Sequence, residues 1–169
     1  NRIDTSTLSP SAQLNQRMLA TTLDEDLESF ESGLHLIALN MRSGPQHRYT
    51  MVDRLPMSSE RDYLDWLARL EKLPEQLKQY QALLESGVRT ERTQARIIIE
   101  RIPNQLDALI VENPEDSPFW GVFENMPKAI ESDTAQELRN KARSVIGESL
   151  TPAYAAFKAF IEERYLPNS

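Results

Sequence analysis

The sequence predicts an all-α fold: an irregular helical bundle with antiparallel helix hairpins and a long, proline-kinked C-terminal helix. Apolar residues recur at steps of three and four in four separate segments, which is the spacing of one face of an α-helix. The only strand-like run, Ile97–Ile99, continues such a stripe. A chain of 169 residues is long enough to bury a core, so we expect one helical domain spanning residues 1–169.

The first expected helix begins at Pro10. Ser9 precedes it, and a serine cap followed by proline at the first helical position is a typical helix start. The polar and apolar residues that follow run without a break to Gly33, where we expect the helix to end.

Residues 59–87 are interpreted as two helices. Ser59 and Asp62 have the spacing of a capping box, and an apolar stripe follows as far as Leu73. Pro74 is read as the start of the next helix, which Gly87 ends. The short connection predicts an antiparallel hairpin.

Two later segments contain internal prolines that do not interrupt the apolar pattern. Steps of four, four and three cross Pro103, so residues 93–110 are predicted to form one helix. Residues eleven apart share a helix face on both sides of Pro152, which predicts one helix from about Asp133 to Tyr165, kinked near that proline. Its expected buried stripe faces the helices that carry Trp66 and Ile102, and comprises Val145, Ile146, Leu150, Tyr154, Phe157 and Ile161.

The stretch "VENPEDSPFWGVFENMP" is the main irregular region, with one short helical turn expected from Ser117 and Pro118. Its aromatic residues Phe119 and Trp120 are most simply core. The same segment, "SPFWGVF", is also the best sequence candidate for a partly exposed surface that docks onto a larger partner.

The composition argues against nucleic-acid binding, a membrane span and cysteine-based metal sites. The net charge of −7 argues against a nucleic-acid partner. Arg89, Arg92 and Arg96 form either a small basic patch or, as we favour, a solvated helix face balanced by nearby glutamates. No apolar run approaches the roughly 18 residues of a membrane span. The chain has no cysteine, which excludes disulfides and thiolate metal sites.

The stretch "GLHLIALNMRSGPQH", residues 33–47, holds both histidines of the chain. His35 and His47 are twelve residues apart, whereas a zinc site of the HExxH kind needs two histidines four apart on one helical face. Phosphate-binding glycine motifs and nucleophile elbows are also missing from the sequence. We therefore assign no catalytic, cofactor-binding or metal-ligating residue, and interpret the stretch as a connector.

The order of several landmarks resembles the bacterial family known as domain of unknown function 885. The resemblance covers nearly the whole chain and is clearest from about residue 58 onward. The matching residues are Asp62–Tyr63, Arg69–Leu70, Gln105–Leu106, Ser117–Pro118–Phe119, Pro152–Ala153–Tyr154 and Tyr165–Leu166–Pro167.

The resemblance implies a longer, mostly helical parent protein, often exported or lipoprotein-like. Members of this family are thought to be zinc metallopeptidases related to the gluzincins, with the metal helix in the C-terminal half. No position here matches that motif, so no zinc ligand is carried over, and any zinc belongs to the full-length parent. The chain is expected to be either a fragment from the N-terminal helical part or a truncated relative, and its start at Asn1 without an initiator methionine favours the fragment.

Two functions follow as expectations. The first is a non-catalytic helical scaffold segment of a bacterial zinc metallopeptidase, which contributes to the wall of a substrate channel; a channel-lining role for residues 33–47 is the alternative to a plain connector. Its partners are then the rest of the parent and peptide substrate, in the periplasm or cell envelope. The second is a stand-alone helical binding or protein-interaction module without enzymatic activity.

Overall fold

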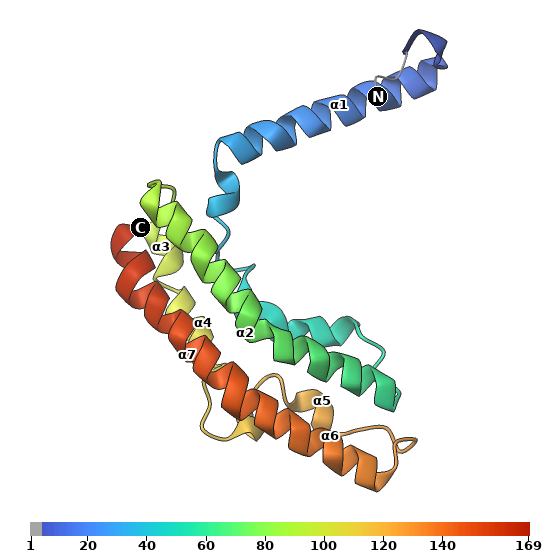
Figure 1. Ribbon diagram of the computed structural model, residues 1–169, viewed down its shortest axis with the longest axis vertical. Coiled ribbons are helices and arrows are strands. Elements are labelled where there is room, and N and C mark those ends of the chain that lie inside the picture. The colour runs from blue at the N-terminus through green and yellow to red at the C-terminus, as the bar shows by residue number, and fades with distance from the viewer. Residues whose placement is uncertain (1–4) are drawn as a thin grey trace.

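The computed structural model describes residues 5–169, and these form an all-α fold without any strand, as the sequence predicted (Figure 1). Ile97–Ile99 is helical. The α-helices are α1 (Pro10–Glu31), α2 (Glu60–Arg89), α3 (Arg96–Ile99), α4 (Ile102–Asp107), α5 (Gly121–Glu124), α6 (Ser132–Ser144) and α7 (Thr151–Phe160). Five 3-10 segments are η1 (Thr5–Thr7), η2 (Leu34–Leu36), η3 (Pro45–Arg54), η4 (Pro114–Asp116) and η7 (Leu166–Asn168), and two π-helical segments are η5 (Val145–Leu150) and η6 (Ile161–Tyr165).

Helix α1 begins as the sequence predicted. Pro10 is its first residue, and the Ser9 side chain accepts a hydrogen bond from the backbone N–H of Ala12. The chain turns at Gly33, which has a φ of +80°, a left-handed conformation that glycine adopts without strain. Figure 1 shows α1 projecting away from the other helices, and none of its residues is buried.

Helix α2 is one continuous helix, so the predicted hairpin at Pro74 is wrong. Its start is the expected capping box, in which Ser59 and Asp62 each hydrogen-bond the backbone of the other. The hydroxyl and N–H groups of Ser59 donate to the Asp62 carboxylate and hold its pKa below the usual value. The helix continues through Pro74 because buried leucines on both sides of the proline pack on the same neighbour, the helical run at the C-terminal end of the chain.

At Pro103, the second internal proline, the helix is broken. Residues 93–110 do not form one helix: α3 ends at Ile99 and α4 begins at Ile102, with Pro103 in the first turn of α4. Proline removes a backbone donor and its ring collides with the carbonyl four residues earlier, here that of Ile99. Proline is tolerated in the first turn of a helix, where its missing N–H needs no partner, so the chain breaks before it.

The third proline lies inside a continuous helical run, as predicted. Segments α6, η5, α7 and η6 join from Ser132 to Tyr165 without a break. Before Pro152 the hydrogen bonding changes to the π pattern, and the N–H of Thr151 donates to the carbonyl of Ile146, five residues back. This wider turn is how the helix accommodates the proline.

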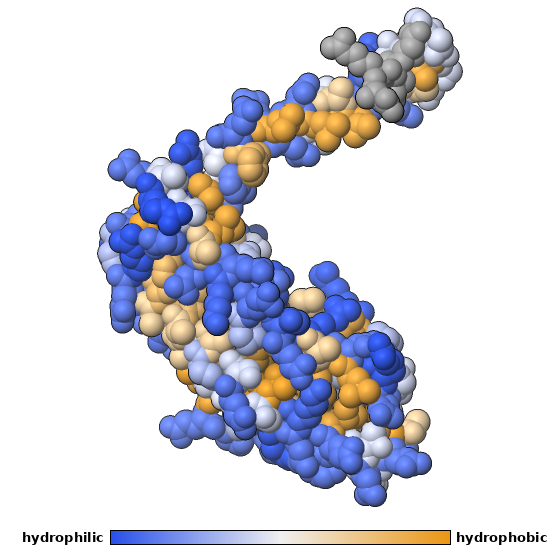
Figure 2. Space-filling view, in the orientation of Figure 1, coloured by the Kyte–Doolittle hydropathy of each residue, from blue (hydrophilic) through white to orange (hydrophobic). Residues whose placement is uncertain are grey.

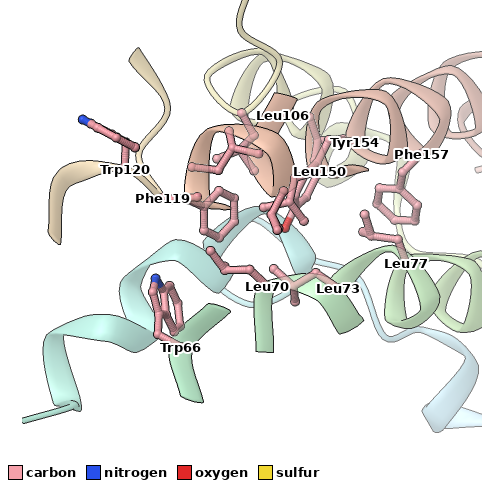
Figure 3. Close-up of a cluster of buried hydrophobic side chains, with 14 of the residues drawn as sticks. Trp66, Leu70, Leu73, Leu77, Leu106, Phe119, Trp120, Leu150, Tyr154 and Phe157 are labelled. Carbon is pink, nitrogen blue, oxygen red and sulfur yellow. The ribbon is translucent and has the colours of Figure 1, made fainter. Parts of the chain in front are cut away.

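The two long helical runs lie side by side and point in the same direction (Figure 1). Two ion pairs show the alignment: Lys141 with Glu71 near the start, and Arg164 with Glu85 near the end. In Figure 3, Leu70, Leu73 and Leu77 of α2 point toward Leu150, Tyr154 and Phe157. All six of the predicted stripe residues in the C-terminal run are buried, which confirms that prediction.

Parallel neighbours need a connection that returns along the bundle, and residues 90–131 supply it. The N–H of Gln94 donates to the Tyr165 hydroxyl (2.9 Å), and Lys158 pairs with Asp107, so α3 and α4 run antiparallel to the C-terminal helix. Within residues 5–169, no helix is both long enough and apolar enough to cross a lipid bilayer.

Phe157→Ala is expected to lower the free energy of unfolding by about 3–5 kcal/mol, because the ring is fully buried between α2 and the C-terminal helix. Urea denaturation followed by circular dichroism measures this. Ile97→Ala in α3 is the control: that side chain is 69% exposed, and its loss is expected to cost less than about 0.5 kcal/mol. Equal effects of the two substitutions would contradict the packing described.

Candidate functional site

The predicted connector, residues 33–47, is tied to the core by a network of polar groups. The Gln46 side chain is buried, and its Nε2 donates to the carbonyl of Asn40 (2.7 Å) and to Oε1 of Gln105 (3.2 Å). Gln105 in turn donates to the carbonyl of Met41 (3.2 Å). The connector is thus positioned against α4 rather than left mobile.

Tyr154 holds the end of the same connector. Its hydroxyl, which is buried, donates to the carbonyl of Pro45 (3.0 Å). Burial raises the pKa of this hydroxyl above its usual range, so the group keeps its proton and remains a donor even in alkaline solution. The hydrogen bond joins the C-terminal helix to the first residue of η3.

Neither histidine is placed to bind a metal. The exposed ring of His35 stacks on Phe30 at 4.4 Å between ring centroids. Nε2 of His47 lies 2.8 Å from the carbonyl oxygen of Met41. Across the described residues, no group of three or more His, Cys, Asp or Glu side chains is arranged to hold a metal ion. The part of the chain that the structure describes therefore presents no side-chain cluster that fits a zinc site.

The aromatic side chains of "SPFWGVF" are buried, whereas Pro118 and Gly121 are exposed, so the rings themselves do not form a docking surface. Phe119, Trp120 and Phe123 are each no more than 4% exposed. The aromatic ring of Phe119 stacks on Tyr154 at 5.9 Å between centroids, and Arg143 lies over the Trp120 ring. This segment belongs to the core, which was the simpler interpretation.

The best candidate for a binding site is a groove between η3 and α2, of about 570 Å³. Figure 1 shows η3 running toward the end at which α2 begins, antiparallel to the first half of α2. Nε of Arg48 donates to Oε1 of Gln76 (3.0 Å). The groove has an apolar floor and a basic rim. We call it the η3–α2 groove; its floor is Met51, Trp66, Leu70 and Leu73, and its rim is Arg48, Arg69 and Lys72.

The groove has a net positive rim and one buried hydrogen-bond donor without a partner. Its one carboxylate, Glu75, lies 3.5 Å from Lys72, so the two guanidinium groups keep the rim positive. Nε1 of Trp66 is buried and has no hydrogen-bond partner among the described residues. A second pocket, of about 370 Å³, shares Arg48 and Met51 and adds Arg42 and Arg54, which extends the basic surface toward the connector.

In a comparison with protein families, residues 1–169 match the family described as "Bacterial protein of unknown function (DUF885)". The chain belongs to this family. No curated protein and no solved structure shows significant similarity to it.

Most of the family landmarks in the sequence have structural roles in this family member. Asp62 caps α2, and the hydroxyl of its neighbour Tyr63 donates to the carbonyl of Val122 (3.1 Å). Gln105 and Tyr154 fix the connector, as described above. Arg69 is the exception: it is exposed and lines the groove.

Sequence reasoning missed the groove. The stretch from Pro45 to Arg54 has no regular apolar period, so no element was expected there, and it forms a 3-10 helix. The available signal was Arg69 itself, a charged residue within a landmark whose neighbours are apolar.

Tyr154→Phe is expected to cost about 1–2 kcal/mol of unfolding free energy, because the carbonyl of Pro45 loses its buried donor. Thermal and urea denaturation give the value. Tyr49→Phe is the control, since its ring packs edge-on against Phe119 but its hydroxyl makes no hydrogen bond to the described residues. If both variants were equally stable, the hydrogen bond between Tyr154 and the connector would contribute nothing to the free energy of unfolding.

Proposed function

We propose that this family member is a non-catalytic helical scaffold segment whose η3–α2 groove forms part of a polypeptide-binding channel wall. The observation that carries the proposal is the groove itself, an apolar floor beneath two arginines and a lysine. Apolar surface with a few charged groups at its edge is the usual composition of a peptide-binding groove. The basic rim favours acidic segments.

The catalytic part of the proposal concerns the parent protein rather than these residues. In a zinc metallopeptidase of the envelope or periplasm, the metal and its ligands would be supplied by another part of the polypeptide, and this segment would position the substrate. The fixed connector and the two parallel long helices support a rigid wall of this kind.

A second candidate function is a stand-alone interaction module without enzymatic activity. It is favoured by α1, which exposes a row of large apolar side chains (Figure 2). Monomeric proteins seldom expose a continuous apolar patch without a binding role.

Binding in the groove is tested by the fluorescence of Trp66, made the only tryptophan by Trp120→Phe. An acidic amphipathic peptide, rich in leucine and glutamate, is expected to shift the emission in a saturable way at low protein concentration, and to remain intact by mass spectrometry. Arg69→Glu with Lys72→Glu is expected to weaken binding about tenfold, the equivalent of roughly 1.4 kcal/mol.

The matched control peptide carries lysine in place of each glutamate. Like charges at the rim are expected to prevent its binding. Equal binding of the two peptides, or no change in Trp66 emission with either, would overturn the proposal.

A further inference from the structure

Helix α1 has an apolar row that is largely uncovered in the described chain, where the ring of His35 stacks on Phe30 at the end of the row. Leu19, Leu23, Leu27 and Phe30 follow one another at steps of four, four and three, and each is more than half exposed. At 100° per residue they fall within a narrow stripe of the helix surface. Figure 2 shows hydrophobic residues in a row along this helix.

The same helix is strongly acidic. Its last eight residues, "DEDLESFE", hold five carboxylates, and Arg17 is its one basic residue. An acidic, amphipathic helix is the kind of ligand that the η3–α2 groove is proposed to take. The groove offers an apolar floor and three cations, and its single carboxylate already lies beside Lys72.

The lengths also agree. Leu19 to Phe30 spans about 17 Å at 1.5 Å per residue, and the groove extends from Trp66 to Gln79 on α2, about 20 Å. One row of α1 is therefore long enough to fill one groove.

Helix α1 is held away from the groove of its own chain. Nε of Arg92 donates to the carbonyl of Ser32 (2.8 Å), and the Arg92 side chain packs so closely on Gly33 that a Cβ there would collide with it. This contact lies at the far end of α2 from the start of the groove, and it sets the direction in which α1 leaves the core (Figure 1).

We propose that α1 of one molecule binds the η3–α2 groove of a second copy of the same chain, and that the exchange is reciprocal. The inference rests on the proposed function in one respect, the capacity of the groove for an acidic amphipathic segment. Two equivalent contacts bury twice the area of one, and stable interfaces bury about 1,200–2,000 Å² in total. A symmetric pair formed in this way is closed.

Pairing of two α1 helices with each other is disfavoured by charge. Carboxylates border the apolar row: Asp24 and Asp26 lie on its two sides, next to Leu23 and Leu27 in sequence. An antiparallel pair would bring two such clusters together, whereas the groove brings each cluster to Arg48, Arg69 and Lys72.

The test is the mass of the 169-residue chain by sedimentation equilibrium over a range of concentrations. The wild-type chain is expected to approach the mass of two chains and to dissociate as salt is raised. An α1 variant, Leu23→Glu with Leu27→Glu, and a groove variant, Arg69→Glu with Lys72→Glu, are each expected to have the mass of one chain. Arg101→Glu, an exposed charge reversal outside the groove, is expected to leave the dimer intact.

Mixing distinguishes the arrangements. The α1 variant retains a functional groove and the groove variant retains a functional α1, so an equimolar mixture is expected to regain part of the dimer. Unchanged circular dichroism, and unchanged melting at a dilution where the wild-type chain is monomeric, show that the fold is kept. This is expected because α1 has no buried residue and Arg69 and Lys72 are exposed.

A wild-type chain that stays monomeric at all concentrations overturns the proposal, and so does a groove variant that still dimerises alone, which would indicate contact between α1 helices. The peptide assay separates this failure from that of the proposed function. A monomer whose Trp66 still responds to the acidic peptide refutes only the exchange, whereas loss of both responses refutes the binding groove as well.

Discussion

The structure depends on the packing of one long helical run, Ser132–Tyr165, along α2. Each contributes an apolar stripe that continues across an internal proline, and the ring of Phe157 lies fully buried between them (Figure 3). Burial of a large apolar side chain contributes about 1.5–3 kcal/mol. The stripes supply many such residues, which offsets the local cost of Pro74 and Pro152. The ion pairs at either end are exposed and act mainly on alignment.

Parallel alignment of these helices has consequences for the rest of the chain. Residues 90–131 must return along the bundle, and they do so as short helices whose carbonyls and amides are bound by Tyr63, Arg139 and Tyr165. The connector before α2 is then fixed by Gln46, Gln105 and Tyr154. Segment η3 is thereby held beside α2, and the groove is the space between them. The groove is therefore a product of the core rather than of a mobile loop.

Much of the fold could be predicted from the sequence, because helical period, the Ser9 and Ser59 caps and the turn at Gly33 are local signals. The prolines show the limit. All three lie within apolar patterns that continue on both sides of the proline. In the structure, however, Pro74 lies inside a helix, Pro103 comes after a break between two helices, and Pro152 comes after a π-helical turn. The outcome depends on how much long-range packing holds both sides of the proline, which a single sequence does not reveal. The groove and the exposure of α1 depend on the same tertiary arrangement.

Native-state hydrogen exchange tests this account most directly, measured at a dilution where the chain is monomeric. We expect amides on both sides of Pro74 and from Ile146 to Tyr165 to exchange slowest, with one common free energy of opening equal to that of global unfolding. Amides of α1 are predicted to exchange much faster, because its residues contribute nothing to the core. Rapid exchange after Pro74, or α1 amides as slow as those of α2 in the monomer, would contradict a core built on these two helices.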